Sequence, residues 1–257
     1  MEKPPLFFIH GMWATPKVFD WLKQRYEARG HRVFTPALPF HDVDPAAPPE
    51  PLLATTGVRD YVDALLAAGR EVGEVPIIVG HSMGGMLAQK VAAAQGARAL
   101  ALLAPAPTAQ TSSLSINSLR TLTGVATTNK WWKSATKIDA ERARWGIFNN
   151  VPPTDTAEAL SELVWDSGRV LLQMSMPFAD KQRSTEVDYD RLDMPALVMI
   201  GDEDRITPVA TARRTARRLT GEVDYVELPG VGHWLFHHPV RERLAEELDR
   251  LIERAAR

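Results

Sequence analysis

A serine flanked by glycines stands between an apolar run and a helix-forming segment. The pattern G-x-S-x-G is matched by Gly80-His81-Ser82-Met83-Gly84. A sharp turn from strand to helix lifts such a serine hydroxyl above the sheet, and glycines on both sides remove side chains that would collide there. The pattern therefore predicts Ser82 as a nucleophile. The alternative is a glycine-rich turn whose serine only caps the helix.

A serine hydroxyl is a poor nucleophile near neutral pH, so a base must accompany it at the same end of the sheet. His233 fits this role, because it follows the apolar run 223–228 and precedes the last helix-forming segment. His237 and His238 compete with it, but their position before Pro239 is typical of a helix entry. A structural role for His233 is the remaining alternative. The other four histidines fit less well, and His81 is expected to point away from its neighbour Ser82; they are His10, His31, His41 and His81.

The base needs a carboxylate that accepts its Nδ1 proton and fixes the tautomer. The segment 201–208 offers Asp202, Glu203 and Asp204 directly after the apolar run 196–200. Asp204 is preferred because it reaches further into the loop toward His233, and Asp202 is the second choice. Asp202 and Glu203 are alternatively solvated turn residues.

A second turn of interest, His10-Gly11-Met12-Trp13, follows the first apolar run. A glycine turn in this position aims the Met12 amide toward the nucleophile, where it joins the Met83 amide as a donor to an oxyanion. The short pattern alone is equally typical of a plain turn at a strand end. Its meaning depends on the serine, the histidine and the carboxylate.

The elements that must position these residues alternate along the chain. Six short apolar runs predict strands, most of them buried on both faces: 6–9, 33–38, 75–79, 99–103, 196–200 and 223–228. Between them lie amphipathic segments that predict helices: 15–29, 57–72, 83–95, 208–219 and 239–256. This alternation predicts a mainly parallel sheet of about six strands covered by helices.

Residues 107–190 interrupt the alternation, with Ser/Thr-rich stretches followed by helix-forming residues and no clear strand. We expect an inserted helical cap, with the core formed by 1–106 and 191–257. The tryptophans of this region are alternatively ordinary core residues. The apolar residues expected to line a substrate pocket are Trp13, Trp131, Trp132, Trp145, Phe148 and Met176, with Met174 and Phe178 in support.

Composition excludes several classes of protein. The formal net charge of −2 and the absence of a Lys/Arg-rich run argue against nucleic-acid binding. The chain has no cysteine, which excludes a disulfide scaffold, a thiolate nucleophile and a cysteine-ligated metal. No run is long enough for a signal-peptide core or a membrane span, so a cytoplasmic protein is expected.

The order of these motifs (His-Gly turn, G-x-S-x-G, G-x-x-D-x-x-x-P and a late Gly-His) resembles that of the α/β-hydrolase family, in its serine esterase and monoglyceride-lipase-like branch. The resemblance spans nearly the whole chain. It implies Ser82 as nucleophile, Asp204 as acid and His233 as base, with the Met12 and Met83 amides as oxyanion hole. It also implies a lid formed by 107–190.

The chain departs from the family at its start, because the first apolar run already leads into His10-Gly11. The two leading strands of the family are therefore expected to be missing. A trimmed sheet edge invites cover by a second copy of the chain, which would give a homodimer.

The resemblance implies hydrolysis of a small carboxylic ester, with a short to medium acyl chain or an aromatic group, through an acyl-enzyme and without metal or organic cofactor. Thioesterase, lactonase, C–C bond hydrolase and perhydrolase chemistry use the same serine machinery and stay open. A ligand-binding module without turnover is the alternative from another class.

Overall fold

Six parallel strands form the central sheet, in the order β2-β1-β3-β4-β7-β8. The computed structural model describes residues 3–113, 115–126 and 129–256. The strands are β1 (Leu6–Ile9), β2 (Val33–Phe34), β3 (Ile77–His81), β4 (Ala99–Leu103), β7 (Ala196–Gly201) and β8 (Val223–Leu228). The predicted six-stranded parallel sheet is confirmed.

Two strands differ from their predicted bounds because of proline. β2 ends at Phe34 instead of residue 38, since Pro36 lacks the N–H that the sheet ladder needs. The Leu38 N–H donates instead to His10 Nε2 at 3.1 Å. β3 begins at Ile77, directly after Pro76, and continues to His81.

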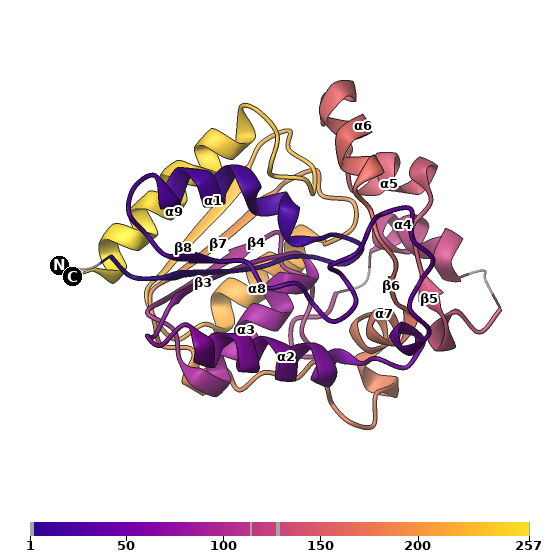
Figure 1. Ribbon diagram of the computed structural model, residues 1–257, viewed down its shortest axis with the longest axis horizontal. Helices are drawn as coiled ribbons and strands as arrows, with labels where there is room; N and C mark the ends of the chain where they lie inside the picture. The colour runs from indigo at the N-terminus through magenta and orange to yellow at the C-terminus, as the bar shows by residue number, and fades with distance from the viewer. Residues whose placement is uncertain (1–2, 114, 127–128, 257) are drawn as a thin grey trace.

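Helices cover both faces of the sheet. Figure 1 shows α1 (Asp20–Glu27) and α9 (Val240–Ala255) over one face, and α2 (Val58–Glu71), α3 (Met83–Gln95) and α8 (Val209–Arg218) over the other. The first predicted helix is split, because a short 3-10 turn, η1 (Pro16–Phe19), precedes α1. No helix in the described ranges is both long and apolar enough to span a bilayer.

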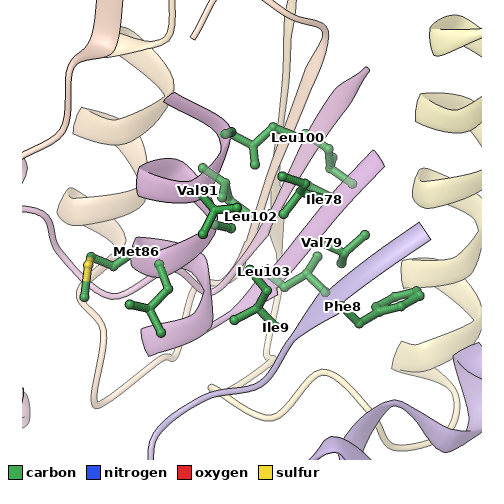
Figure 2. Packing of buried hydrophobic residues seen from close by; sticks show 14 of the residues in the cluster. Phe8, Ile9, Ile78, Val79, Met86, Val91, Leu100, Leu102 and Leu103 are labelled. Carbon is green, nitrogen blue, oxygen red and sulfur yellow. The ribbon is translucent and has the colours of Figure 1, made fainter. Parts of the chain in front are cut away.

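The core lies between the sheet and these helices. The side chains of β1, β3 and β4 are buried, and Met86 and Val91 of α3 pack against them (Figure 2). This double burial is why the strands read as continuous apolar runs rather than as alternating patterns.

The segment between β4 and β7 gathers at the carboxyl end of the strands, opposite the two chain termini (Figure 1). Its helices are α4 (Ile116–Ala126), α5 (Ala140–Gly146), α6 (Pro153–Ser161) and α7 (Gly168–Ser175). Besides η1, the described residues form four short 3-10 turns: η2 (Pro51–Ala54), η3 (Trp131–Lys133), η4 (Pro177–Ala179) and η5 (Tyr189–Arg191).

The expectation of no strand between 107 and 190 was wrong. β5 (Ala135–Thr136) and β6 (Asp166–Ser167) form an antiparallel pair within this segment. Strands of two residues leave no period in the sequence, which is why the pattern missed them.

Gly84, in the first turn of α3, sits where the helix crosses the end of β1. A Cβ at this position would collide with the Ile9 carbonyl oxygen, a backbone atom that cannot move aside. Gly84→Ala should therefore destabilise the protein by roughly 3 kcal/mol, the upper range for overpacking. Thermal or urea unfolding measures the effect.

Gly73→Ala is the matched control. Gly73 has φ +78° and nothing within 4 Å of an added Cβ, so it reports left-handed backbone strain without a collision. Its expected cost is about 1 kcal/mol. Equal losses in the two variants would contradict the close approach of α3 to β1.

Candidate active site

Ser82 occupies the turn between β3 and α3 in a strained conformation, with φ 55° and ψ −121°. A non-glycine residue holds positive φ only where its surroundings enforce it. Here the Ser82 N–H donates to the Leu103 carbonyl at 2.9 Å, and the Ser82 carbonyl accepts from Gly85 and Ala106 N–H at 2.9 and 2.8 Å. The backbone is thus fixed on both sides of the serine.

His233 and Asp204 meet in a buried hydrogen bond. The His233 Nδ1 donates to Asp204 Oδ2 at 2.7 Å, and neither side chain is appreciably exposed. The other carboxylate oxygen accepts the Ile206 and Thr207 N–H groups at 2.9 and 2.8 Å, and the Thr207 hydroxyl donates to Oδ2 at 2.6 Å. These four donors fix the orientation of the carboxylate. Because His233 binds it through Nδ1, the other ring nitrogen, Nε2, is not engaged by Asp204.

The competing residues have other partners. Asp202 is exposed and accepts the Gly230 N–H at 2.7 Å, and Glu203 accepts from the Asn150 side-chain amide at 2.8 Å. His237 Nδ1 donates to the Trp234 carbonyl at 2.9 Å. Asp204 and His233 are the pair that the structure brings together.

The His81 side chain, which was expected to point away from Ser82, packs against His233. Its ring lies 4.9 Å from the His233 ring, and its Nε2 lies 3.3 Å from the His233 carbonyl oxygen. Burial, aided by the nearby His233, holds the pKa of His81 well below its usual value, so the ring is neutral and donates from Nε2. The contact comes from a loop 152 residues later, and local sequence carries no signal for it.

The turn after β1 packs directly on the serine. A Cβ on Gly11 would lie 3.0 Å from Ser82 Cβ and 3.2 Å from the His81 carbonyl oxygen, so a larger residue would press on the serine turn. Met83 is the first residue of α3, and its N–H is one of those without a partner inside the helix. Met12 and Met83 line the same cavity as Ser82.

That cavity has a volume of about 800 Å³ and is reached by both Ser82 and His233. Six aromatic residues contribute to its wall: Trp13, Trp21, Phe148, Phe178, Trp234 and Phe236. Charged residues also line the cavity: Lys17, Asp20, Asp155, Glu158, Glu162 and Arg241.

The family profile of alpha/beta hydrolases matches residues 6–246. The chain belongs to the alpha/beta hydrolase family. No curated protein matched it by sequence.

Solved structures share the fold of this hydrolase at low identity. A monoacylglycerol lipase of Paleococcus ferrophilus has 18% identity and a TM-score of 0.69, with 98% of this chain and 96% of that chain covered. A pyrethroid hydrolase from Sphingobium faniae JZ-2 has 20% identity and a TM-score of 0.68, with 97% of each chain covered. A methylesterase from Arabidopsis has 14% identity and a TM-score of 0.70, with 96% and 98% covered.

The predicted pocket residues of the hydrolase divide into two groups. Trp13, Phe148 and Met176 line the cavity. Trp131, Trp132 and Trp145 lie outside its wall.

The reasons for their placement differ. Trp131 is buried in the packing of the 107–190 segment, whereas Trp132 is 41% exposed. Trp145 stacks beneath the guanidinium groups of Arg120 and Arg205, at 4.2 and 5.0 Å from its ring centre.

Three aromatic wall residues were not identified from the sequence: Trp21, Trp234 and Phe236. Trp234 directly follows His233 in the chain, and this adjacency was the available signal. Among the described residues, no group of three or more His, Asp or Glu side chains is arranged to hold a metal ion.

Asp204→Asn should slow covalent labelling of Ser82 by a fluorophosphonate probe by about 10³- to 10⁴-fold, because an amide cannot stabilise the charged imidazole or fix its tautomer. Asp202→Asn should change the rate by less than about threefold, as for other surface substitutions. Intact-mass kinetics with peptide mapping measure both. The reverse ranking would move the acid by two positions.

Proposed function

We propose that this hydrolase cleaves carboxylic esters through an acyl-enzyme formed on Ser82. The observation that carries the proposal is the buried 2.7 Å bond from His233 Nδ1 to Asp204 Oδ2, whose histidine shares a cavity with a serine held at a strained turn. A buried carboxylate that fixes one imidazole nitrogen serves to direct the other toward a proton donor.

In the first half-reaction, His233 Nε2 takes the Ser82 hydroxyl proton while Oγ attacks the ester carbonyl. The negative charge that forms on the carbonyl oxygen is stabilised by the amides of Met12 and Met83. Collapse of this intermediate breaks the bond to the alcohol oxygen, and the proton on His233 passes to the leaving alcohol. The acyl group is then esterified to Ser82.

In the second half-reaction, water replaces the alcohol. His233 removes one proton from the water as its oxygen attacks the acyl carbon, and the same amides stabilise the second oxyanion. The bond to Ser82 Oγ breaks, the serine regains its proton from His233, and the carboxylic acid leaves. The cycle consumes one water per ester and calls for no metal or organic cofactor.

Substrate size follows from the cavity. A volume of about 800 Å³ with six aromatic side chains in its wall suits a small apolar ester, with a short to medium acyl chain or an aromatic group. The structural relatives, a monoacylglycerol lipase, a pyrethroid hydrolase and a methylesterase, support ester chemistry. The 107–190 segment, which supplies Phe148, Met176 and Phe178, is proposed as the cap that selects among esters.

Ser82→Ala and His233→Ala should each lower turnover of p-nitrophenyl esters by about 10⁵- to 10⁶-fold while leaving the thermal unfolding curve close to that of the wild type. The panel should run from acetate to decanoate and include phenylacetate, a thioester and a lactone. Its ranking then separates ester hydrolysis from thioesterase and lactonase chemistry. Undiminished ester hydrolysis in either variant, or ligand binding without turnover in the wild type, would overturn the proposal.

A further inference from the structure

A charged cluster is buried beside the site and takes no part in the proposed proton transfers. Its centre is Asp166, in β6 of the 107–190 segment, and its other members come from the core of the protein. Both Asp166 and His41 have no exposed side-chain surface. A fully buried carboxylate is costly unless each oxygen is compensated, so the partners of Asp166 indicate what it does.

Donors surround the carboxylate on both oxygens. Oδ1 accepts from the Tyr61 hydroxyl at 2.7 Å and from the Ser167 N–H at 2.6 Å. Oδ2 accepts from the Trp13 N–H at 3.1 Å and lies 3.1 Å from His41 Nε2. The distance between His41 Nε2 and Asp166 Oδ2 is that of an ion pair, but the two atoms are not aligned for a hydrogen bond.

His41 is the titratable partner of this carboxylate. Its Nδ1 donates to the Pro39 carbonyl at 2.9 Å, and its Nε2 is the ring nitrogen that lies nearest to Asp166. Burial lowers the pKa of His41, but Asp166 outweighs burial and raises it above the usual value. The neighbouring His10 is neutral, because burial and then His41 lower its pKa to about 3.

Residues 164–166 bind both backbone groups of Trp13, its N–H and its carbonyl. Its N–H donates to Asp166, and its carbonyl accepts the Val164 N–H at 2.8 Å. Trp13 has φ +60°, a conformation that needs such enforcement. The N–H of the Met12–Trp13 peptide and the carbonyl of the following peptide are therefore both bound by the 107–190 segment.

From the other side, His10 fixes the same turn. Its Nδ1 donates to the Gly11 carbonyl at 3.0 Å, which belongs to the peptide that carries the Met12 N–H. The Met12 residue thus lies between a peptide held by His10 and a peptide held by Asp166.

We propose that Asp166 is a positioning residue of the oxyanion hole, which acts through the Trp13 N–H to aim the Met12 amide at the charge developing above Ser82. The proposal rests on the proposed function, since it assigns Asp166 a role in that reaction. It also means that the segment forming the pocket and the donor that stabilises the oxyanion are joined by one carboxylate.

Asp166→Asn tests the proposal with almost no change in size. All four neighbours of the carboxylate are donors, whereas an amide accepts at one end only. The amide nitrogen is best placed against His41, which becomes an acceptor once it is neutral, and Trp13 then loses its acceptor. We expect kcat to fall by about 10- to 100-fold, less than the loss of an oxyanion donor outright.

The decisive readout compares a ligand that uses the oxyanion hole with a ligand that does not. 2-Phenylethylboronic acid forms a tetrahedral adduct with Ser82 and uses the oxyanion hole, whereas an ether isostere of the best ester does not. In Asp166→Asn, the affinity for the boronic acid should fall by the same factor as kcat, with the ether affinity unchanged. Unchanged kcat and boronic acid affinity, or an equal fall for both ligands, would overturn the proposal.

Gln173→Leu is the matched control. Gln173 of α7 also joins the 107–190 segment to the core through a buried bond, because its Oε1 accepts the Val58 N–H at 2.9 Å, but it does not contact the turn after β1. This variant should lower stability and leave the boronic acid affinity within about twofold of the wild type. If Gln173→Leu lost as much boronic acid affinity as Asp166→Asn, the effect would come from weaker packing of the 107–190 segment on the core and not from the oxyanion hole.

The double variant Asp166→Asn/His41→Asn covers the case in which the single variant does not fold. It removes both charges together, so no ion is left buried without a partner. The same selective loss of boronic acid affinity is expected. Wild-type protein without Ser82-dependent hydrolysis would refute the proposed function, whereas an active wild type with a fully active Asp166→Asn would refute this inference alone.

Discussion

Six parallel strands point their carboxyl ends to one edge of the sheet, and every feature of the candidate site depends on this constraint. The turn after β1, the serine turn after β3, the acid loop after β7 and the histidine loop after β8 all begin there. Parallel strands are joined by helices, so each loop is separated in sequence yet adjacent in space. A buried hydrogen bond between residues 29 positions apart, such as that from His233 to Asp204, is a direct result.

Much of this arrangement was predictable because it follows from local patterns in the sequence. β1, β4 and β8 and helix α3 have the predicted bounds, since apolar runs flanked by turn residues define them. Ser82, Asp204 and His233 were singled out for the same reason, as each stands at the end of such a run. Their roles in catalysis stay predictions until the experiments above are done.

The remainder depended on contacts that no local pattern contains. Large aromatic side chains are typical of a pocket, which is why Trp131, Trp132 and Trp145 were expected there. Their positions depend instead on packing within the 107–190 segment and, for Trp145, on two arginine side chains. His81 was judged by its adjacency to Ser82, whereas a distant carbonyl sets its orientation. The role of Asp166 could not be predicted, because a single aspartate in a region without periodicity has the pattern of a surface residue, whereas the structure buries it completely.

The buried carboxylate of Asp166 has a consequence for how such an enzyme can change its specificity. Residues of the 107–190 segment line the cavity, so an exchange of this segment would change the cavity while the sheet stays in place. The same segment carries Asp166, which lies against His41 and accepts the Trp13 N–H. A chimera with another segment in this place would leave His41 and the Trp13 N–H without their carboxylate, unless the new segment also has an anionic side chain at this depth.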